Sequence, residues 1–210
     1  SETPYWFPID RVPDGFNTKQ PKMSHGITHV HHFYSKRNLI CAAGFWSHLP
    51  RKLKWIATAF LSRNLTKLNR YVVNPHNPKG RVNGPLTGTL YIPSEVVEQS
   101  ALELFKDKII KAGWKTKGNL IQTSSATQLH KFPDNAADYL FIDPPFGANI
   151  MYSELSFIWE SWLALLTNNA KEAIENKTQN KSLNEYRELM TSCFSEAYRV
   201  LKPGRWMTVE

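Results

Sequence analysis

The sequence predicts an α/β fold in which parallel strands with flanking helices form part of a sheet, preceded by a basic, largely helical N-terminal region. Two observations lead to this prediction. Short apolar runs alternate with helical periodicity from residue 119 onward. Residues 1–130 hold 18 Lys/Arg and 7 Asp/Glu, whereas residues 131–210 hold 8 and 11. We therefore expect two regions, 1–113 and 114–210.

The N-terminal region is predicted to be mostly helical. Residues 1–26 are rich in Pro, Gly and polar side chains, which predicts an extended segment. Ser35 is a candidate N-cap for a helix through Ser47, and Pro50 separates it from a second helix over 51–64. Farther along, we expect an exposed loop over 74–88, a short strand over 88–92, and a helix from the cap Ser94 to Gly113.

The second region is predicted to alternate strands and helices. Residues 119–123 form a candidate strand, and the nearly all-apolar residues 138–142 predict a parallel strand buried on both faces. A helix is expected over 152–166, with Trp159 and Trp162 in the core. Ser182 and Glu185 form a capping box for a helix over 183–201, and another strand is expected to begin at Arg205.

Composition excludes several protein classes. Hydrophobic residues make up 41% of the 210, which is enough to bury a core. No uncharged run is long enough to span a bilayer, and the first residues do not resemble a signal peptide. The two cysteines match no disulfide framework and no zinc spacing. We therefore expect a cytoplasmic protein with no membrane association.

The basic charge is concentrated in one stretch. The 80 residues between Asp14 and Glu95 contain no acid, but hold 12 Lys/Arg, six of the seven histidines and nine aromatics. This pattern has two interpretations: solvated helix faces, or a surface that neutralises nucleic-acid phosphates. The candidate DNA contacts in this stretch are His31, Lys36, Arg37, Arg51, Lys52 and Lys54.

Two further polar groups have alternative interpretations. His29 and His31 would share a face on a strand, but no nearby cysteine or acid completes a metal site with them or with His32. We predict no metal here; base stacking, phosphate contact and ordinary packing all stay open. The polar stretch 177–181 with Lys177, Gln179, Asn180 and Lys181 is either a solvated loop or a DNA contact.

The residues with the most specific chemistry are Asp143-Pro144-Pro145-Phe146, directly after the predicted strand 138–142. Ligands of open parallel sheets bind beyond the carboxyl ends of the strands. The two prolines hold the backbone extended and keep carbonyls out of a helix, so Pro144 can present an acceptor. A carboxylate, a carbonyl and a flat ring suit a planar ring with an amino group. The alternative is a plain loop whose acid caps a helix.

These four residues resemble the Asp-Pro-Pro-Tyr/Phe motif of S-adenosylmethionine-dependent methyltransferases that act on exocyclic amines of DNA bases. The preceding stretch, LHKFPDNAADYLFID from Leu129 to Asp143, is also similar to these enzymes. So is the helix-to-strand segment YRVLKPGRWMTV from Tyr198 to Val209. Two other segments, 146–162 and 29–39, look like a subgroup of large bacterial DNA methylases. The resemblance covers most of the chain and is strongest over 119–210.

The resemblance implies a Rossmann-like methyltransferase sheet and a restriction-modification type of DNA methylation. The target base, adenine more than cytosine, would be flipped out of the duplex. Asp143 and the Pro144 carbonyl would hold its amine, and Phe146 would stack on it, in a catalytic set of Asp143, Pro144, Pro145 and Phe146. Asn149 and Tyr152, with Glu154, would line the pocket, or else serve the start of a helix. RNA or a protein glutamine are alternative substrates, since similar motifs serve planar amides.

The chain departs from this family at the cofactor site. None of its ten glycines is spaced Gly-x-Gly, the loop that these enzymes use for S-adenosylmethionine. Ser124-Ser125 stand where relatives often carry an acid near the adenine of the cofactor. We expect the chain to be part of a larger protein whose remainder supplies this loop, with Asp143 as the cofactor contact present here. The alternative is a non-catalytic module that binds DNA or protein.

Overall fold

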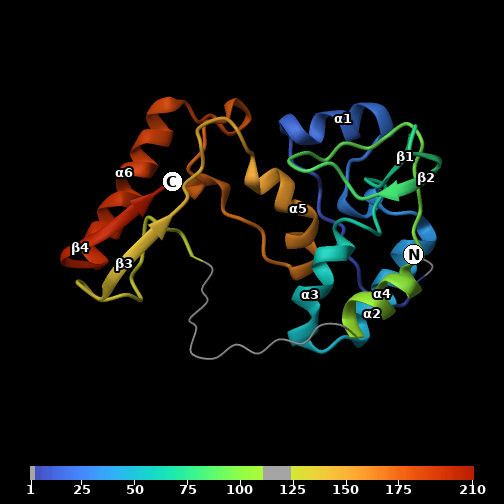
Figure 1. The fold of residues 1–210 in the computed structure, drawn as a ribbon, viewed down its shortest axis with the longest axis horizontal. Coiled ribbons are helices and arrows are strands. Elements are labelled where there is room, and N and C mark those ends of the chain that lie inside the picture. The colour runs from blue at the N-terminus through green and yellow to red at the C-terminus, as the bar shows by residue number, and fades with distance from the viewer. Residues whose placement is uncertain (1–2, 111–123) are drawn as a thin grey trace. The chain divides into compact units, whose positions relative to one another are not determined.

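A computed structural model describes residues 3–110 and 124–210 (Figure 1). The predicted strand 119–123 and the predicted cap Gly113 lie outside these residues. In the described part of the chain, no helix is both long and apolar enough to cross a membrane. The elements, in order, are α1 (Phe16–His25), η1 (Val30–Phe33), α2 (Lys36–His48), α3 (Arg51–Leu61), β1 (Arg70–Asn74), β2 (Asn77–Asn83), α4 (Ala101–Ile110), β3 (Ala137–Ile142), α5 (Tyr152–Leu163), η2 (Asn169–Lys171), η3 (Lys177–Gln179), α6 (Leu183–Val200) and β4 (Leu201–Val209).

The described residues divide into two compact units. The first combines the chain up to residue 110 with residues 153–167, and the second combines residues 124–152 with residues 168–210. The boundary predicted near residue 113 lies outside the described residues and stays a prediction. Because α5 falls almost wholly in the first unit, the chain passes from the second unit into the first and back again.

The first unit has a closed hydrophobic core. Phe45 of α2 stacks on Phe105 of α4 with ring centroids 3.7 Å apart, and Phe60 of α3 meets the edge of Phe105 at 4.7 Å. The apolar spacing of α2 and α3 predicts one buried face for each helix, and both of these faces pack in the same interior. The largest fully buried apolar side chains of this core are Trp162, Phe33, Ile27, Leu61, Leu65, Ile92, Ile158, Val12 and Val30.

Helix α5 is part of that core. Trp162, only 1% exposed, donates from its indole Nε1 to the Tyr34 hydroxyl at 2.8 Å, and that hydroxyl donates to the Leu61 carbonyl at 2.9 Å. Burial raises the pKa of Tyr34, which keeps the hydroxyl protonated for this chain of donors. The prediction of a core position is confirmed for Trp162 and wrong for Trp159, which is 42% exposed.

Helix α1 corrects the prediction of an extended segment over 1–26. The buried carboxylate of Glu154, on α5, accepts from the backbone N–H of Asn17 at 2.8 Å and from its side chain at 3.2 Å. Glu154 thus caps the first turn of α1 from 137 residues away. A Cβ on Gly15 would come within 2.1 Å of this carboxylate, so the carboxylate would have to shift if another residue replaced the glycine. No local sequence signal could predict such a long-range cap.

Other N-terminal predictions are confirmed or corrected. The helices after Ser35 and Pro50 are confirmed as α2 and α3, and the Ser35 side chain accepts from Asn38 N–H. The helix expected from Ser94 starts only at Ala101. The strand over 88–92 is wrong, because the Gln20 side chain, which bonds both backbone groups of Ile92, takes the place of a partner strand.

The loop predicted over 74–88 is also partly wrong. Strands β1 and β2 pair antiparallel with Tyr71 opposite Val82 and Val72 opposite Arg81, and residues 84–88 follow without strand structure. The Gly, Pro and Asn residues that favour a loop belong to a hairpin turn and an irregular β2.

The second unit contains β3 and β4, which pair in parallel, with α6 between them in the chain (Figure 1). The capping box of Ser182 and Glu185 is confirmed at the start of α6. The strand expected from Arg205 is confirmed, although it begins earlier, at Leu201. The described residues therefore form a mixed helix and sheet structure with a two-stranded parallel sheet. This confirms the prediction that helices and parallel strands are combined in the chain.

Burial of β3 on both faces is wrong for the described residues. Tyr139 and Phe141 of β3 are exposed, and Trp206 of β4 is 79% exposed. A parallel sheet needs layers on both faces to bury its side chains, and two strands with one helix do not supply them.

Candidate functional site

Asp143 lies at the carboxyl edge of the parallel pair. The Glu210 N–H donates to the Ile142 carbonyl at 3.1 Å, so the two strands stay paired up to the residue before Asp143. The Asp143 side chain is exposed. The carboxyl ends of β3 and β4 therefore bring the carboxylates of Asp143 and Glu210 to one edge of the sheet, where α/β proteins bind ligands.

The backbone after Asp143 is fixed at three points. The Tyr186 hydroxyl, on α6, donates to the Pro145 carbonyl at 2.8 Å. The Asn149 N–H donates to the Phe146 carbonyl at 3.0 Å and closes a turn, in which Gly147 has φ +53, a value that favours glycine. The Glu175 N–H donates to the Gly147 carbonyl at 3.1 Å. The Phe146 ring stays 57% exposed, so a held backbone presents a free aromatic face.

The sequence singles out Asp143 to Phe146, but it does not reveal Tyr186 as their support. Tyr186 lies one turn into α6, where it looks like any helical aromatic residue. Only the contact between α6 and the motif shows the role of Tyr186. Tyr186 bonds the carbonyl of Pro145, whereas the acceptor that the sequence assigns to the pocket is the carbonyl of Pro144, one residue earlier.

The predicted pocket-lining residues are in different environments. Asn149 is exposed in the turn after Phe146, and Tyr152 is exposed at the first residue of α5. Both follow the motif directly and stay candidates for the pocket. Glu154 is buried and caps α1, so it serves the start of a helix instead of lining the pocket. That helix is α1 and not α5, on which Glu154 lies.

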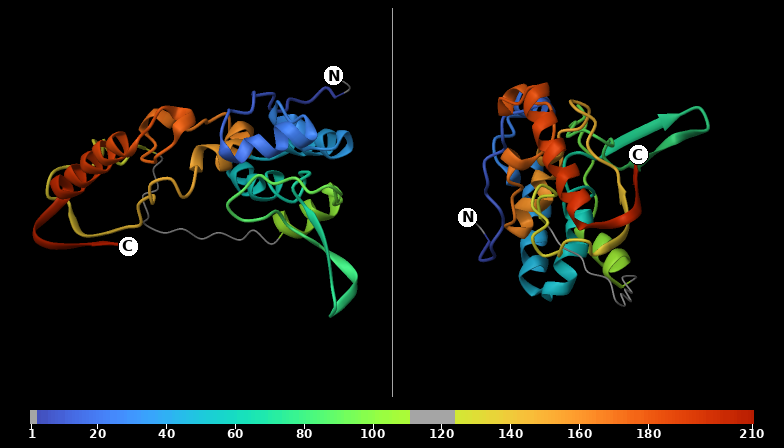
Figure 2. Two further views of the ribbon diagram at one scale, coloured as in Figure 1. Left: turned by 90° about the horizontal axis from the view of Figure 1, so that it is seen from above. Right: turned by 90° about the vertical axis from the view of Figure 1, so that its left-hand side faces the viewer.

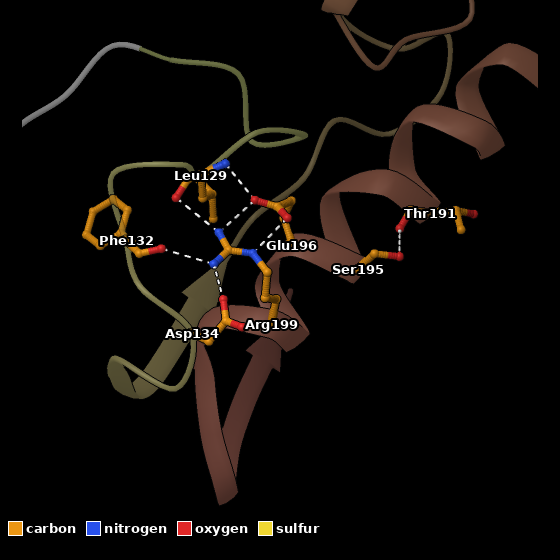
Figure 3. A network of polar contacts seen from close by, with 7 residues as sticks. All are labelled: Leu129, Phe132, Asp134, Thr191, Ser195, Glu196 and Arg199. Carbon is orange, nitrogen blue, oxygen red and sulfur yellow. Dashed lines mark hydrogen bonds and ion pairs between the residues drawn. The ribbon is translucent and has the colours of Figure 1, made fainter.

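A network around Arg199 holds the segment before β3 against α6 (Figure 3). The Arg199 guanidinium donates to the carbonyls of Leu129 and Phe132 at 3.1 and 3.0 Å. It also pairs with the carboxylates of Asp134 at 2.6 Å and Glu196 at 2.9 Å. Glu196 in turn accepts from the Leu129 N–H at 2.7 Å. Five planar donors in a fixed fork make arginine suited to such a junction.

Both aspartates of the stretch PDNAAD, over 133–138, are held by basic side chains. Asp134 pairs with Arg199, and Asp138 pairs with Lys202 at 2.9 Å and Arg205 at 3.5 Å. The hydrogen bond from Lys202 lowers the pKa of Asp138. Hydrogen bonds from Arg199 and then from the Leu129 N–H lower the pKa of Glu196 to about 2. The ion pairs of Asp134 and Asp138 therefore set the position of β3, and Asp143 is the exposed acid at its end.

The polar stretch 177–181 is more structural than the sequence indicates. Lys181 is buried, and its ammonium donates to the carbonyls of Asn169 and Glu172. The backbones of Asn176 and Lys181 bond to each other at 2.9 and 3.0 Å. A DNA contact is therefore wrong for Lys181, while Lys177 and Asn180 are exposed.

The candidate DNA contacts of the first unit fall into two groups. Lys36 and Arg37 begin α2, and Arg37 is exposed although it pairs with Glu98. Arg51, Lys52 and Lys54 begin α3, beyond the far end of α2. At 1.5 Å per residue, α2 separates the groups by about 18 Å along its axis. Lys54 lies 5.0 Å above the Trp46 ring, so part of its charge interacts with that face.

His31 lies in neither group. The rings of His29, His31 and His32 stand 4.4 to 5.6 Å apart at η1, where the short helix, not a strand, brings them together. Burial lowers the pKa of His31 and of His32, and the neighbouring histidines lower it further. Within the described residues, no three His, Cys, Asp or Glu side chains are arranged to hold a metal ion.

The described residues of the first unit include surface hollows away from the motif. One of about 360 Å³ is lined by Cys41, Gly44, Phe45 and His48, and another, of about 400 Å³, lies between α3 and Gly84. Neither is lined by the motif at Asp143.

No family model matches the chain, and no curated protein or solved structure matches it either.

Proposed function

We propose that this chain carries the base-binding half of a methyltransferase that acts on exocyclic amines of DNA, adenine more than cytosine, with S-adenosylmethionine as methyl donor. One observation carries the proposal: Asp143-Pro144-Pro145-Phe146 follows a parallel strand directly, with the acid and the aromatic ring exposed on a backbone that Tyr186 holds.

The residues of this edge suit an amine on a planar ring. The Asp143 carboxylate and the Pro144 carbonyl can each accept one amine hydrogen, which orients the nitrogen lone pair. Phe146 can stack on the face of the flipped base. As the nitrogen gains a bond it becomes more positive, and a fixed carboxylate stabilises that charge. Because Tyr186 and the turn at Gly147 hold the backbone, little reorganisation is needed.

Part of the cofactor site fits the residues present. S-adenosylmethionine, when bound, supplies a methyl group activated by a sulfonium cation. Asp143 and Glu210, two carboxylates at the same sheet edge, provide the negative potential that suits a cation. Asp143 would therefore hold both the amine and the cationic side of the donor. The chain has no Gly-x-Gly pair, so the remaining cofactor contacts are assigned to the rest of the polypeptide.

The basic first unit supports nucleic acid as the substrate. Its acid-free stretch places Arg51 and Lys52 on the surface at the start of α3, where the helix dipole adds to their positive potential. A protein glutamine substrate would not need this surface, which is why we propose DNA ahead of protein.

A methylation assay tests the proposal. The whole protein that contains this chain is incubated with methyl-labelled S-adenosylmethionine and unmethylated genomic DNA, and the modified nucleoside is identified after digestion. We expect label on the N6 of adenine, and Phe146→Ala to transfer it more slowly. Label on RNA or on protein alone would contradict the DNA assignment.

A second candidate is a binding module without turnover, which the lack of any Gly-x-Gly pair favours. Calorimetry of this chain with S-adenosylmethionine separates the two. Saturable binding that Asp143→Ala weakens supports the catalytic proposal, whereas DNA binding with no cofactor binding, in the whole protein as well, supports the module.

A further inference from the structure

The β1–β2 hairpin stands out from the helices of its own unit. Both views in Figure 2 show its teal to green ribbon extending past the helices of the first unit. Tyr71, Val73, Arg81 and Val82 are all exposed along it. A two-stranded ribbon that is open on both faces is marginally stable in water, so an exposed hairpin of this kind needs local support.

That support is present at the root of the hairpin. Asn69, the residue before β1, is fully buried and donates from its side chain to the carbonyls of Asn64 at 2.6 Å and Thr66 at 3.0 Å. Its side-chain oxygen accepts from Gln99 at 3.2 Å. The hairpin is therefore anchored in the first unit by an amide side chain whose nitrogen and oxygen are both hydrogen-bonded.

The ribbon is also stiffened along its length. The Tyr71 hydroxyl donates to the Lys79 carbonyl across the strands. Its ring lies over Gly80, where φ is +70 and a Cβ would come within 2.4 Å of the ring. Arg70 donates from Nε to the Gly84 carbonyl at 3.3 Å. A rigid projecting element loses little entropy when it binds, which favours a role in recognition.

The two faces of the ribbon differ in chemistry. Arg70 pairs with Asn83 and Val72 with Arg81, so these side chains share one face, while Tyr71 and Val82 share the other. Lys79 and His76 lie toward the turn. The hairpin lies inside the stretch between Asp14 and Glu95, so neither it nor the adjoining sequence contributes a carboxylate.

We propose that the β1–β2 hairpin enters the major groove of duplex DNA, with Lys79 and Arg81 contacting the phosphates or base edges beside it. Paired strands lie about 4.8 Å apart, and the major groove, about 12 Å wide, admits a two-stranded ribbon, whereas the minor groove at about 6 Å does not. Exposed Val73 and Val82 suit contact with thymine methyl groups. The choice of DNA rests on the proposed function, but groove binding does not require methyl transfer.

Fluorescence anisotropy of the whole protein on a labelled duplex tests this inference. The variant Lys79→Gln/Arg81→Gln is compared with Lys131→Gln/Arg187→Gln, which removes the same charge from exposed positions of the second unit. Two lost phosphate contacts should weaken binding about 30-fold near 0.15 M salt and reduce the slope of log K against log salt by about 2. The control should bind as the parent does. Equal affinity of parent and hairpin variant would overturn the inference.

Photocrosslinking identifies the groove. Iodine at C5 of a uracil in place of thymine occupies the major groove, where the thymine methyl group lies. We expect crosslinked peptides from residues 70–83; crosslinks only to other segments would contradict the assignment. A duplex of RNA has a narrow, deep major groove, so it should bind more weakly, and equal binding of RNA and DNA duplexes would also contradict it.

The outcomes separate this inference from the proposed function. If the protein methylates DNA but the hairpin variant binds and methylates as the parent does, the hairpin inference fails alone. If no DNA is methylated but binding depends on Lys79 and Arg81, the methyltransferase proposal fails alone. The variant Asp143→Ala should retain hairpin-dependent binding in either case.

Discussion

The two units of this chain are stabilised in different ways. The first buries aromatic residues around Trp162 and holds buried polar groups in hydrogen-bond chains, such as that from Trp162 through Tyr34. The second leaves Tyr139, Phe141 and Trp206 exposed, and the Arg199 network joins its first segment to α6. Apolar strand residues are therefore not by themselves a core, because burial needs covering layers on both faces.

The largest effect is expected when the centre of the first unit's core is removed. We expect Trp162→Ala to reduce the free energy of unfolding of the first unit by about 3–5 kcal/mol, since it deletes a fully buried indole and leaves the Tyr34 hydroxyl without a donor. Trp159→Ala, one turn earlier on the same helix, is half exposed and should cost about 1 kcal/mol or less. Chemical denaturation measures both, and equal losses would contradict the assignment of the core.

A smaller effect is expected at the long-range cap of α1. Glu154→Ala removes the acceptor for two donors of Asn17 and should cost about 1–3 kcal/mol. Hydrogen exchange should show that the first turn of α1 loses protection before α2 does. Glu188→Ala, an exposed acid on α6, is the matched control and should leave α1 protection unchanged.

The stability of the second unit should depend on pH in the acid range, in a direction set by the pKa of Glu196. Its pKa is lowered from 4.5 to about 2 in the folded chain, chiefly by the hydrogen bond from Arg199. The unfolded state therefore binds the proton more readily, and the stabilisation is complete above pH 4.5 and lost as pH falls toward 2. NMR titration of the Leu129 amide follows this loss. If the parent and Glu196→Gln lost stability over the same acid pH range, Glu196 would not stabilise the second unit in this way.

The smallest effect is expected at the histidine cluster of the first unit. The pKa values of His31 and His32 are lowered from 6.5, by burial first and then by their cationic neighbours. Folding therefore opposes their protonation, so stability is complete above pH 6.5 and decreases as pH falls below it. His31→Gln/His32→Gln should flatten the dependence of the unfolding temperature on pH near 6, and His130→Gln should not.

Local signals in the sequence predict several elements correctly. Ser35, the Ser182–Glu185 box and the apolar spacing of α3 predict helices, because caps and periodicity act within a few residues. The apolar run before Asp143 is also a local signal, and it correctly predicts that Asp143 to Phe146 follow the end of a strand.

Long-range contacts account for the failures. Glu154 starts α1, Gln20 replaces a strand partner for Ile92, and Tyr186 supports Pro145, and each contact joins residues at least 41 positions apart. The hairpin is hidden by its Gly, Pro and Asn residues, which local rules assign to a loop. Exposure of β3 depends on how many layers surround it, which its own apolar sequence does not specify.

The most direct test of the central claim is single-turnover methyl transfer by Asp143→Asn in the whole protein. The substitution keeps the size of the side chain but removes the charge that would stabilise the amine. We predict a rate about 100- to 1000-fold below that of the parent, with DNA binding unchanged. Glu188→Gln, which removes an exposed carboxylate of the same unit, should transfer at the parental rate. Transfer at the parental rate by Asp143→Asn would show that the Asp143 carboxylate does not stabilise the reacting amine.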